Sequence, residues 1–254
     1  MKKTVLFWIL AFIITAGSAI FQRMTGPTYP KKGEITFEDK KIVYKLERSH
    51  VSTSNYVVEL ETGDPEIKAI VKWRKYKTLD EFYVAEMKGN KILMAEIPAQ
   101  APLEKVEYFI ELSKAGTQAM IPDGKTIVMR FKGDVPPWVL IPHIIAMFLA
   151  MMLSTRTAFE GFAAVPNLKK YSIWTLAVLF IGGFPLGFAM NWYAFGQMWG
   201  GIPFGNDITD NKTLIAFVGW IVAYYMIKKN QMPKLFVILA ALLMLIVYMI
   251  PHSV

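Results

Sequence analysis

The chain has 254 residues, of which 54% are hydrophobic and 14% aromatic, and it contains no cysteine. This composition is too apolar for an ordinary soluble domain and predicts an integral membrane protein, while the lack of thiols excludes disulfides, thiolate metal sites and cysteine nucleophiles. The net charge of +8 does not indicate a nucleic-acid partner, because residues 31–134 are nearly balanced and most excess basic residues flank hydrophobic runs.

The first hydrophobic run covers residues 4–21 and follows two lysines. Residues 5–14 alone have the length of a signal-peptide core, and Gly17-Ser18-Ala19 would suit cleavage, whereas the whole run is just long enough to cross a bilayer. We therefore interpret residues 1–22 as an N-terminal transmembrane anchor or a signal peptide, and favour the anchor. Either form sends the following segment out of the cytoplasm.

Residues 35–133 contain seven short runs in which apolar and polar residues alternate, separated by turn signals such as TGDP, KGNK and PDGK. Alternation with a period of two is typical of half-buried strands. In one run, Val106, Tyr108, Ile110 and Leu112 share a face. Seven strands at this spacing predict a β-sandwich. The runs are KIVYKLE, YVVELET, KAIVKWR, DEFYVAEM, KILMAEIP, KVEYFIEL and TIVMRFK.

The strand series VKWRKY, DEFYVAEM, NKILMAEIPAQAPLEKVEYFIELSKAG and IVMRFKG is similar to the immunoglobulin-like and fibronectin type III-like modules of extracytoplasmic bacterial proteins. The resemblance covers residues 36–133 and rests on a pattern of strands, not on a catalytic signature. It implies an all-β immunoglobulin-like sandwich outside the cytoplasm. Such modules bind, space or scaffold, so the resemblance assigns no functional residue.

Four further hydrophobic runs follow at residues 138–154, 171–190, 213–227 and 235–250. Each is about long enough to cross a membrane. Residues 137–254 therefore predict a four-helix membrane domain, and the whole chain predicts a mixed fold with five transmembrane helices, or four if the first is cleaved.

The distribution of basic residues predicts the orientation of these helices. The predicted cytoplasmic flanks hold Lys2, Lys3, Arg156, Lys169, Lys170, Lys228, Lys229 and Lys234, and the external flanks hold Arg23 and Lys212. Because basic residues accumulate on the cytoplasmic side, we expect a multi-pass protein of the bacterial cytoplasmic (inner) membrane. Its N-terminus lies inside, its C-terminus outside, and its β-sandwich is extracytoplasmic.

One imidazole, His143, lies near the external end of the run 138–154, with Met147 and Met151 spaced behind it. Positions four apart differ by about 40° around a helix, so these side chains form one stripe. With His252 beyond the last helix, they are the candidate cofactor ligands, for haem or copper. The favoured interpretation is structural, with no cofactor, because methionines on membrane helices usually pack against neighbours; a protonation or transport role for His143 is a further alternative.

Two further patterns in the helical region concern packing. In FIGGFPLGF at residues 180–188, Pro185 predicts a kink, and Gly183 with Gly187 predicts close helix approach. Arg156 and Glu160 are spaced i and i+4, which predicts a local ion pair of little energetic weight beyond the membrane boundary.

The external loop 191–213 groups oxygen-bearing side chains at Asn206, Asp207, Asp210 and Asn211. Asp207 and Asp210 are candidate ligands of a metal such as calcium, although the spacing is not that of an EF-hand. The favoured interpretation is that Asp207 or Thr209 caps a helix beginning near residue 210.

The sequence contains no P-loop, HExxH, CxxCH, GxSxG or kinase signature, so we expect no enzyme. The leading hypothesis is a non-catalytic integral membrane protein. Its β-sandwich recognises or docks a partner, and its helices integrate it into an assembly of membrane or extracytoplasmic proteins. The alternative is a haem- or copper-binding redox or metal-handling protein that uses His143. The third is a small transporter or channel subunit, which would need an oligomer because four helices leave little room for a path.

Overall fold

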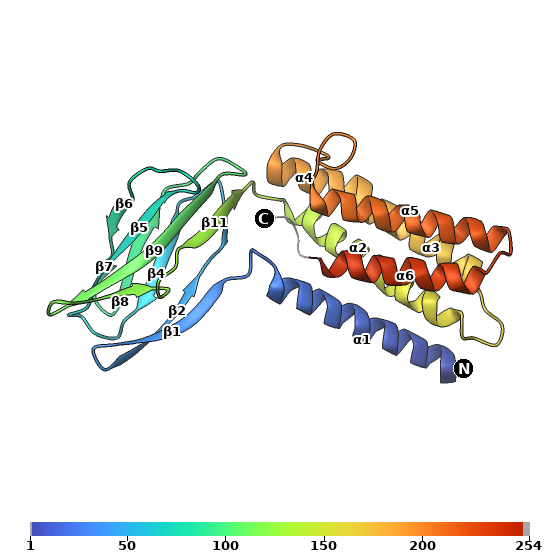
Figure 1. Cartoon of the computed structure of the whole chain (residues 1–254), viewed down its shortest axis with the longest axis horizontal. Helices are drawn as coiled ribbons and strands as arrows, with labels where there is room; N and C mark the ends of the chain where they lie inside the picture. Colours follow the sequence, from blue (N-terminus) through green and yellow to red (C-terminus); the bar gives the residue numbers. More distant parts are fainter. Residues whose placement is uncertain (1, 251–254) are drawn as a thin grey trace. The chain divides into compact units, whose positions relative to one another are not determined.

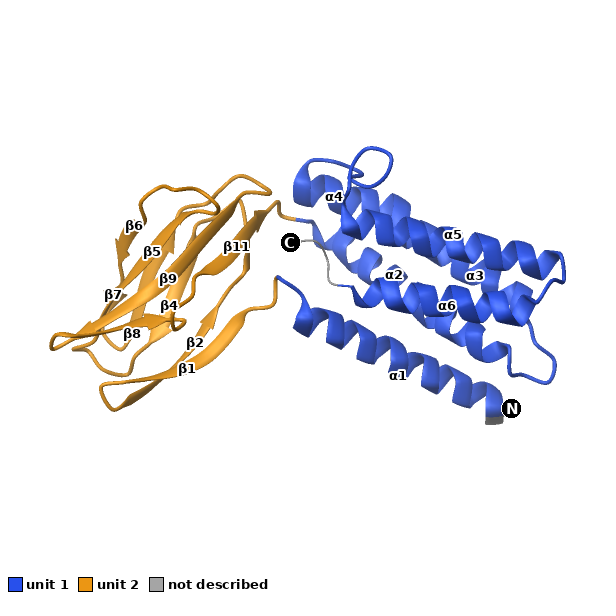
Figure 2. Ribbon diagram, in the orientation of Figure 1, with its two compact units in different colours: residues 1–27, 135–253 blue, residues 28–134, 254 orange. Residues whose placement is uncertain are grey.

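The computed structural model describes residues 2–250, and these fold as two compact units (Figures 1 and 2). The β unit takes Thr28–Asp134. The helical unit takes the chain up to Pro27 and again from Val135 onward. The first helix thus belongs with the C-terminal helices, although the whole β unit separates them in the sequence.

The β unit contains strands in three hydrogen-bonded sheets. β1 and β2 form a hairpin, a larger sheet has the order β3-β11-β9-β5-β6 with β10 paired to β9, and a third has the order β4-β8-β7. The pairings are antiparallel except for the parallel pair of β3 and β11. The strands are β1 (Lys31–Phe37), β2 (Lys40–Leu46), β3 (Ser49–Val51), β4 (Tyr56–Glu61), β5 (Lys68–Lys75), β6 (Tyr83–Glu86), β7 (Lys88–Gly89), β8 (Ile92–Ile97), β9 (Lys105–Lys114), β10 (Thr117–Ile121) and β11 (Ile127–Lys132).

The inward faces of these sheets share one hydrophobic core. On β9, Val106, Tyr108, Ile110 and Leu112 are buried, as the period-two pattern predicts. The seven predicted strands are all present, as β2, β4, β5, β6, β8, β9 and β11. The others were not predicted. β1, for example, begins with the polar stretch KKGE, so its extended state depends on pairing with β2 rather than on its own alternation.

The helical unit consists of five rods. Its elements are α1 (Lys2–Thr25), α2 (Pro137–Glu160), α3 (Leu168–Ile181), the π-helical turn η1 (Gly182–Leu186), α4 (Gly187–Phe195), α5 (Ile208–Lys228) and α6 (Pro233–Met249). α3, η1 and α4 follow one another without a break and make one rod. Together with the β unit, these rods give the mixed β and helical architecture that the sequence predicts.

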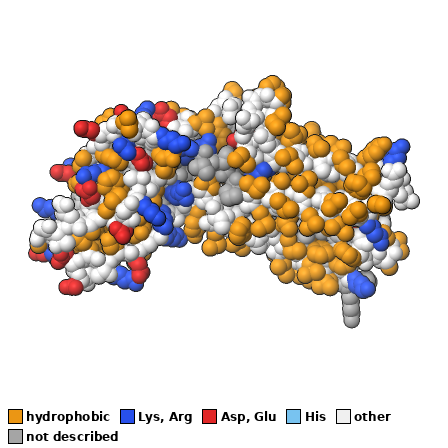
Figure 3. All heavy atoms as spheres, in the orientation of Figure 1, with side chains coloured by type: hydrophobic (Ala, Val, Ile, Leu, Met, Phe, Trp, Pro, Cys, Tyr) orange, Lys and Arg blue, Asp and Glu red, His pale blue; other side chains and the backbone are white. Residues whose placement is uncertain are grey.

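Three of the described helices are long and apolar enough to cross a membrane, judged by length and composition. They are Lys3–Thr25, Pro137–Glu160 and the continuous rod Leu168–Phe195. The space-filling view shows apolar side chains spread over the visible face of the helical unit, whereas charged side chains are scattered over the β unit (Figure 3). Large side chains such as Ile13, Ile141 and Ile246 are exposed on the helices.

α1 packs against α2 and α6 instead of standing apart as a separate anchor. Phe7 stacks on Phe159 of α2, with ring centroids 5.8 Å apart. Near the other end of α1, Gln22 Nε2 donates to the carbonyl oxygen of Tyr248, at 2.6 Å. The first helix is therefore an integral wall of the helical unit.

The glycines of η1 allow two neighbouring rods to approach closely. A methyl group on Gly183 would lie 2.5 Å from Cγ2 of Thr213 on α5, and one on Gly182 would lie 3.0 Å from Cβ of Ala146 on α2. Gly187 meets only a carbonyl of its own rod. The prediction that Gly183 and Gly187 together allow close helix approach is therefore wrong for Gly187. The two glycines that face neighbouring rods are Gly182 and Gly183, because the wider π-helical turn directs them to different neighbours.

Candidate functional site

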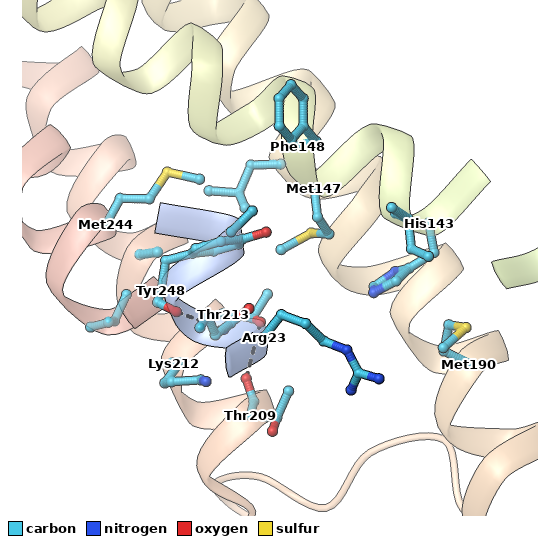
Figure 4. A pocket seen from close by; sticks show the side chains of 16 residues that line it. Arg23, His143, Met147, Phe148, Met190, Thr209, Lys212, Thr213, Met244 and Tyr248 are labelled. Carbon is cyan, nitrogen blue, oxygen red and sulfur yellow. Dashed lines mark hydrogen bonds between the residues drawn. The ribbon is translucent and has the colours of Figure 1, made fainter. Parts of the chain in front are cut away.

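A cavity of about 410 Å³ lies within the helical unit (Figure 4). Its size falls within the range of roughly 300–1,000 Å³ that is typical of small-molecule sites. All five rods contribute to its wall. The lining residues are Ala19, Gln22, Arg23, His143, Ile144, Met147, Phe148, Leu179, Met190, Thr209, Lys212, Thr213, Ala216, Met244, Val247 and Tyr248.

The chain direction explains why these side chains meet at one end of the unit. Most lining residues come from the C-terminal parts of α1 and α6 and from the N-terminal halves of α2 and α5, and Leu179 and Met190 come from the rod of α3, η1 and α4. Two hydrogen bonds join the rods there: Gln22 donates to the carbonyl of Tyr248, and Lys212 Nζ donates to the carbonyl of Ile250, at 2.7 Å. The last carbonyls of a helix lack partners within it, so both bonds complete the C-terminal end of α6.

His143 is fixed by a backbone contact with the π-helical turn. Its Nδ1 donates to the carbonyl oxygen of Gly182, at 3.0 Å. A carbonyl oxygen only accepts, so the proton must lie on Nδ1, and Nε2 of the neutral ring keeps a lone pair. Figure 4 shows the imidazole directed into the cavity. The site thus contains an oriented imidazole next to a π-helical turn, a feature that is frequent at functional sites.

The charged groups of the cavity are all basic. Arg23 and Lys212 contribute a guanidinium and an ammonium, and none of the described lining residues is acidic. Lys212 is only 8% exposed, and its bond to Ile250 uses one of three ammonium donors. A buried charge needs compensation, and the carboxylate of Asp207 interacts electrostatically with Lys212.

Polar and apolar lining residues occupy different depths. On α1, Arg23 is nearer the helix end than Ala19; on α5, Lys212 is nearer the end than Ala216. On α2, His143 likewise precedes Phe148 by more than one turn. The cavity is therefore amphipathic, with its basic and hydrogen-bonding groups toward the end of the unit and its apolar wall deeper between the rods.

The structure brings together only part of the predicted cofactor stripe. His143 and Met147 both line the cavity. Met151 does not, because it is fully buried in the core between the rods. His252 lies outside the described residues. Two thioethers that the sequence analysis did not select, those of Met190 and Met244, complete the methionine part of the wall.

The carboxylates of the loop before α5 hold that loop to the helix. Asp207 is the N-cap, and its Oδ1 accepts from the amides of Thr209 and Asp210, which confirms the predicted cap. Asp210 accepts from the amide of Gly200, at 2.6 Å, and from Asn191 Nδ2, at 2.9 Å. Within residues 2–250, no three His, Asp or Glu side chains are arranged to hold a metal ion.

A second charged cluster lies at the other ends of α1 and α2. Arg156 Nη1 and Glu160 Oε2 are 2.6 Å apart, and the two side chains are 1% and 7% exposed. The guanidinium carbon of Arg156 lies over the rings of Phe7, Trp8 and Tyr171, at 5.4, 5.4 and 4.6 Å from their centroids. The ion pair is present, but the prediction that it lies in solvent and carries little energetic weight is wrong, because side chains of α1 and α3 bury it.

Comparison of the chain with known proteins found no matching family model and no matching curated protein. A functional assignment therefore depends on the cavity and on the properties of the two units.

Proposed function

We propose that this chain is an integral membrane protein that binds a small amphiphilic molecule in the cavity of its helical unit and presents its β unit to a protein partner outside the cytoplasm. It binds and docks, and it does not catalyse a reaction. The observation that carries this proposal is the amphipathic cavity of about 410 Å³. A ligand with a polar head and an apolar chain would match both of its regions.

The exposed apolar surface of the helical unit supports membrane integration. A soluble unit would bury side chains such as Ile9, Phe12 and Leu239, which are exposed here. α5 and α6 complete a bundle of five spans in this proposal. The 17 residues of α6 extend about 26 Å, close to the ~30 Å thickness of the hydrocarbon core. The charged residues near the start of α5 have polar partners: Asp210 accepts from Gly200 and Asn191, and Lys212 donates to Ile250.

The basic residues that remain exposed support an orientation with the cavity on the external side. Exposed lysines cluster at one end of the rods, at Lys3, Lys169, Lys170, Lys228, Lys229 and Lys234. Arg156, which the sequence analysis placed among the cytoplasmic basic residues, is buried and therefore does not support this orientation. A positive end faces the cytoplasm, so the N-terminus lies inside, and the opposite end, which carries the cavity, faces outward across a bacterial inner membrane.

The strand order supports an immunoglobulin-like sandwich as the docking module. β11, β9, β5 and β6 are neighbours in one sheet, and β4 and β8 pair in another, which matches the separation of strands CFG from strands B and E in that fold. The parallel pairing of β3 with β11 places a short strand beside the last one. A module of this class, tied to a membrane bundle, suits partner recognition in an assembly.

The test is photolabelling of the full-length protein in membranes with a single-chain lipid that carries a diazirine near the middle of its chain. We expect saturable labelling of cavity residues such as Phe148 and Met244, and its loss in Ala216→Phe, which fills the cavity. Ile221→Phe, on the exposed side of α5, is the matched control. Labelling that spreads over the exposed helix faces and resists competition would contradict the proposal.

The orientation can be tested with single cysteines because the native chain has none. Leu79→Cys, at a fully exposed position of the β unit, should react with an impermeant maleimide in intact cells. Lys170→Cys should react only after the membrane is opened. The reverse pattern would overturn the proposed topology.

The docking role can be tested by native mass measurement of the protein after gentle solubilisation. If only a free monomer is found, the docking role is contradicted.

A second candidate function is binding of copper(I) in the same cavity. The observation in its favour is that the thioethers of Met147, Met190 and Met244 line one space with His143, and soft thioethers select Cu(I). It ranks second because Arg23 and Lys212 would repel a cation in a medium of low dielectric constant. Stoichiometric copper, or a haem Soret band, that disappears in His143→Ala would favour this candidate; colourless, metal-free protein would reject it.

A further inference from the structure

We propose that the amphiphile bound by the cavity is an anion with a phosphate-like or carboxylate head, which Arg23 and Lys212 hold at the outer end while its chain lies along the deeper apolar wall. This inference rests on the proposed function and specifies the class of its ligand. It identifies two basic side chains as determinants of ligand class.

The first argument is the charge of the wall. Among the described lining residues, Arg23 and Lys212 are basic and none is acidic. Two carboxylates lie nearby on the chain: Asp207, which interacts electrostatically with Lys212, accepts from the amides of Thr209 and Asp210, and Asp210 accepts from the amide of Gly200 and from Asn191. Guanidinium and ammonium groups form the strongest hydrogen bonds to carboxylates and phosphates, so an anionic head suits this wall.

The second argument is the position of the two cations. Figure 4 shows the guanidinium of Arg23 extended into the cavity, near the level of Thr209 and Lys212. Lys212 is held by the carbonyl of Ile250, so its ammonium is fixed before a ligand binds. Prior fixation lowers the entropy that binding must overcome. A head group at this depth would also meet the hydroxyls of Thr209 and Thr213.

The third argument is an opening toward the exposed side of the rods. Ile144 lines the cavity and is nevertheless 55% exposed, so the wall is incomplete where α2 faces outward. In a membrane that side is occupied by lipid chains. A chain longer than the cavity can therefore continue from the apolar wall into the bilayer, as expected for a molecule taken from the outer leaflet.

The test is native mass spectrometry of the full-length protein, purified in a neutral maltoside detergent and titrated with lysophosphatidic acid or with a monoacylglycerol of the same chain length, whose head group is uncharged. We expect one lysophosphatidic acid per chain, bound at least tenfold more tightly than the monoacylglycerol. Arg23→Gln should weaken binding of lysophosphatidic acid by roughly 10- to 100-fold, the range for one charged hydrogen bond, and leave binding of the monoacylglycerol unchanged. Lys170→Gln removes an exposed charge at the other end of the rods and should change neither.

The outcomes separate the two levels of the proposal. If the two lipids bind equally, or if Arg23→Gln leaves binding of lysophosphatidic acid unchanged, the ligand is not selected for its negative charge. The proposal of an anionic ligand then fails, while the amphiphile-binding function stands. Binding of neither lipid overturns the proposed function itself. Inorganic phosphate is the third ligand: if it binds alone as tightly as the acid, the site takes a free anion and the amphiphile assignment fails. Ala19→Phe, which fills the apolar part without changing charge, should abolish binding of both lipids, and retention of both would place them outside the cavity.

Discussion

His143 on α2 and Gly182 in η1 are joined by a hydrogen bond of 3.0 Å from the imidazole Nδ1 to the backbone carbonyl. This bond couples the orientation of a cavity side chain to the π-helical turn of a neighbouring rod. In the proposed membrane, no water is present to replace the imidazole as a donor to this carbonyl, so we expect the bond to contribute to stability.

We expect His143→Phe to lower the stability of the helical unit. Phenylalanine fills similar space but cannot donate, so the hydrogen bond to Gly182 is lost, at a net cost of about 0.5–1.5 kcal/mol. Thermal unfolding of the full-length protein in mild detergent measures the effect. Ile145→Phe, at a neighbouring exposed position, is the control, and equal melting temperatures for the two variants would contradict the prediction.

We expect single removal of Arg156 or Glu160 to be strongly destabilising. Breaking a buried pair leaves one charge uncompensated, at a cost of about 3–5 kcal/mol. Arg156→Met or Glu160→Met should each show this loss in chemical unfolding. The double variant Arg156→Met with Glu160→Met should lose less than either single one, because no isolated charge remains. Simple additivity in this double-mutant cycle would show that the pair is not coupled.

We expect α1 to remain part of the protein in the membrane. Its contacts with Phe159, Arg156 and Tyr248 would be lost on cleavage, and one wall of the cavity would be removed. Intact mass measurement of protein isolated from native membranes decides the question. A mass that lacks the first 19 or so residues, the region in which the signal-peptide pattern ends, would contradict the prediction.

We expect Gly183→Ala to destabilise the helical unit more than Gly187→Ala. The added methyl group would lie 2.5 Å from Cγ2 of Thr213 at position 183, and overpacking of this kind costs about 1–3 kcal/mol. At position 187 it would meet only a carbonyl of its own rod, at 3.5 Å. Melting temperatures of the two variants give the comparison, and Gly183→Ala combined with Thr213→Ser should recover part of the loss.

We expect the β unit to lose stability in acid through Asp64. The Lys114 ammonium, 2.8 Å away, and then the amide of Glu66 lower the pKa of Asp64 below its usual 3.8. The folded state therefore binds this proton less readily than the unfolded state. The resulting stabilisation is complete above about pH 4 and is lost as pH falls through the lowered value.

The measurement is hydrogen exchange of β5 and β9 peptides in the full-length protein as a function of pH. Asp64→Asn should exchange faster than the native protein near neutral pH, and the difference should shrink in acid. Asp123→Asn, which removes an exposed turn carboxylate, is the control. A difference that stays constant down to the lowest pH would show that Asp64 does not carry this pH dependence.

The resemblance to immunoglobulin-like modules and the docking role remain predictions, whereas the strands themselves were readable because their evidence is local. Alternation in KVEYFIEL was enough to place Tyr108 and Ile110 in a core. The strand β1 was missed because its apolar content is low, and its pairing with β2 supplies the hydrogen bonds that make it extended.

By itself, the sequence determined seven of the strands and the segments apolar enough for a membrane, because periodicity and hydrophobicity act over neighbouring residues. The tertiary structure alone decided that Arg23, His143, Lys212 and Met244 line one cavity and that Arg156 is buried. Those properties depend on how five rods pack against one another, and a side chain's environment is set by neighbours that are remote in the chain.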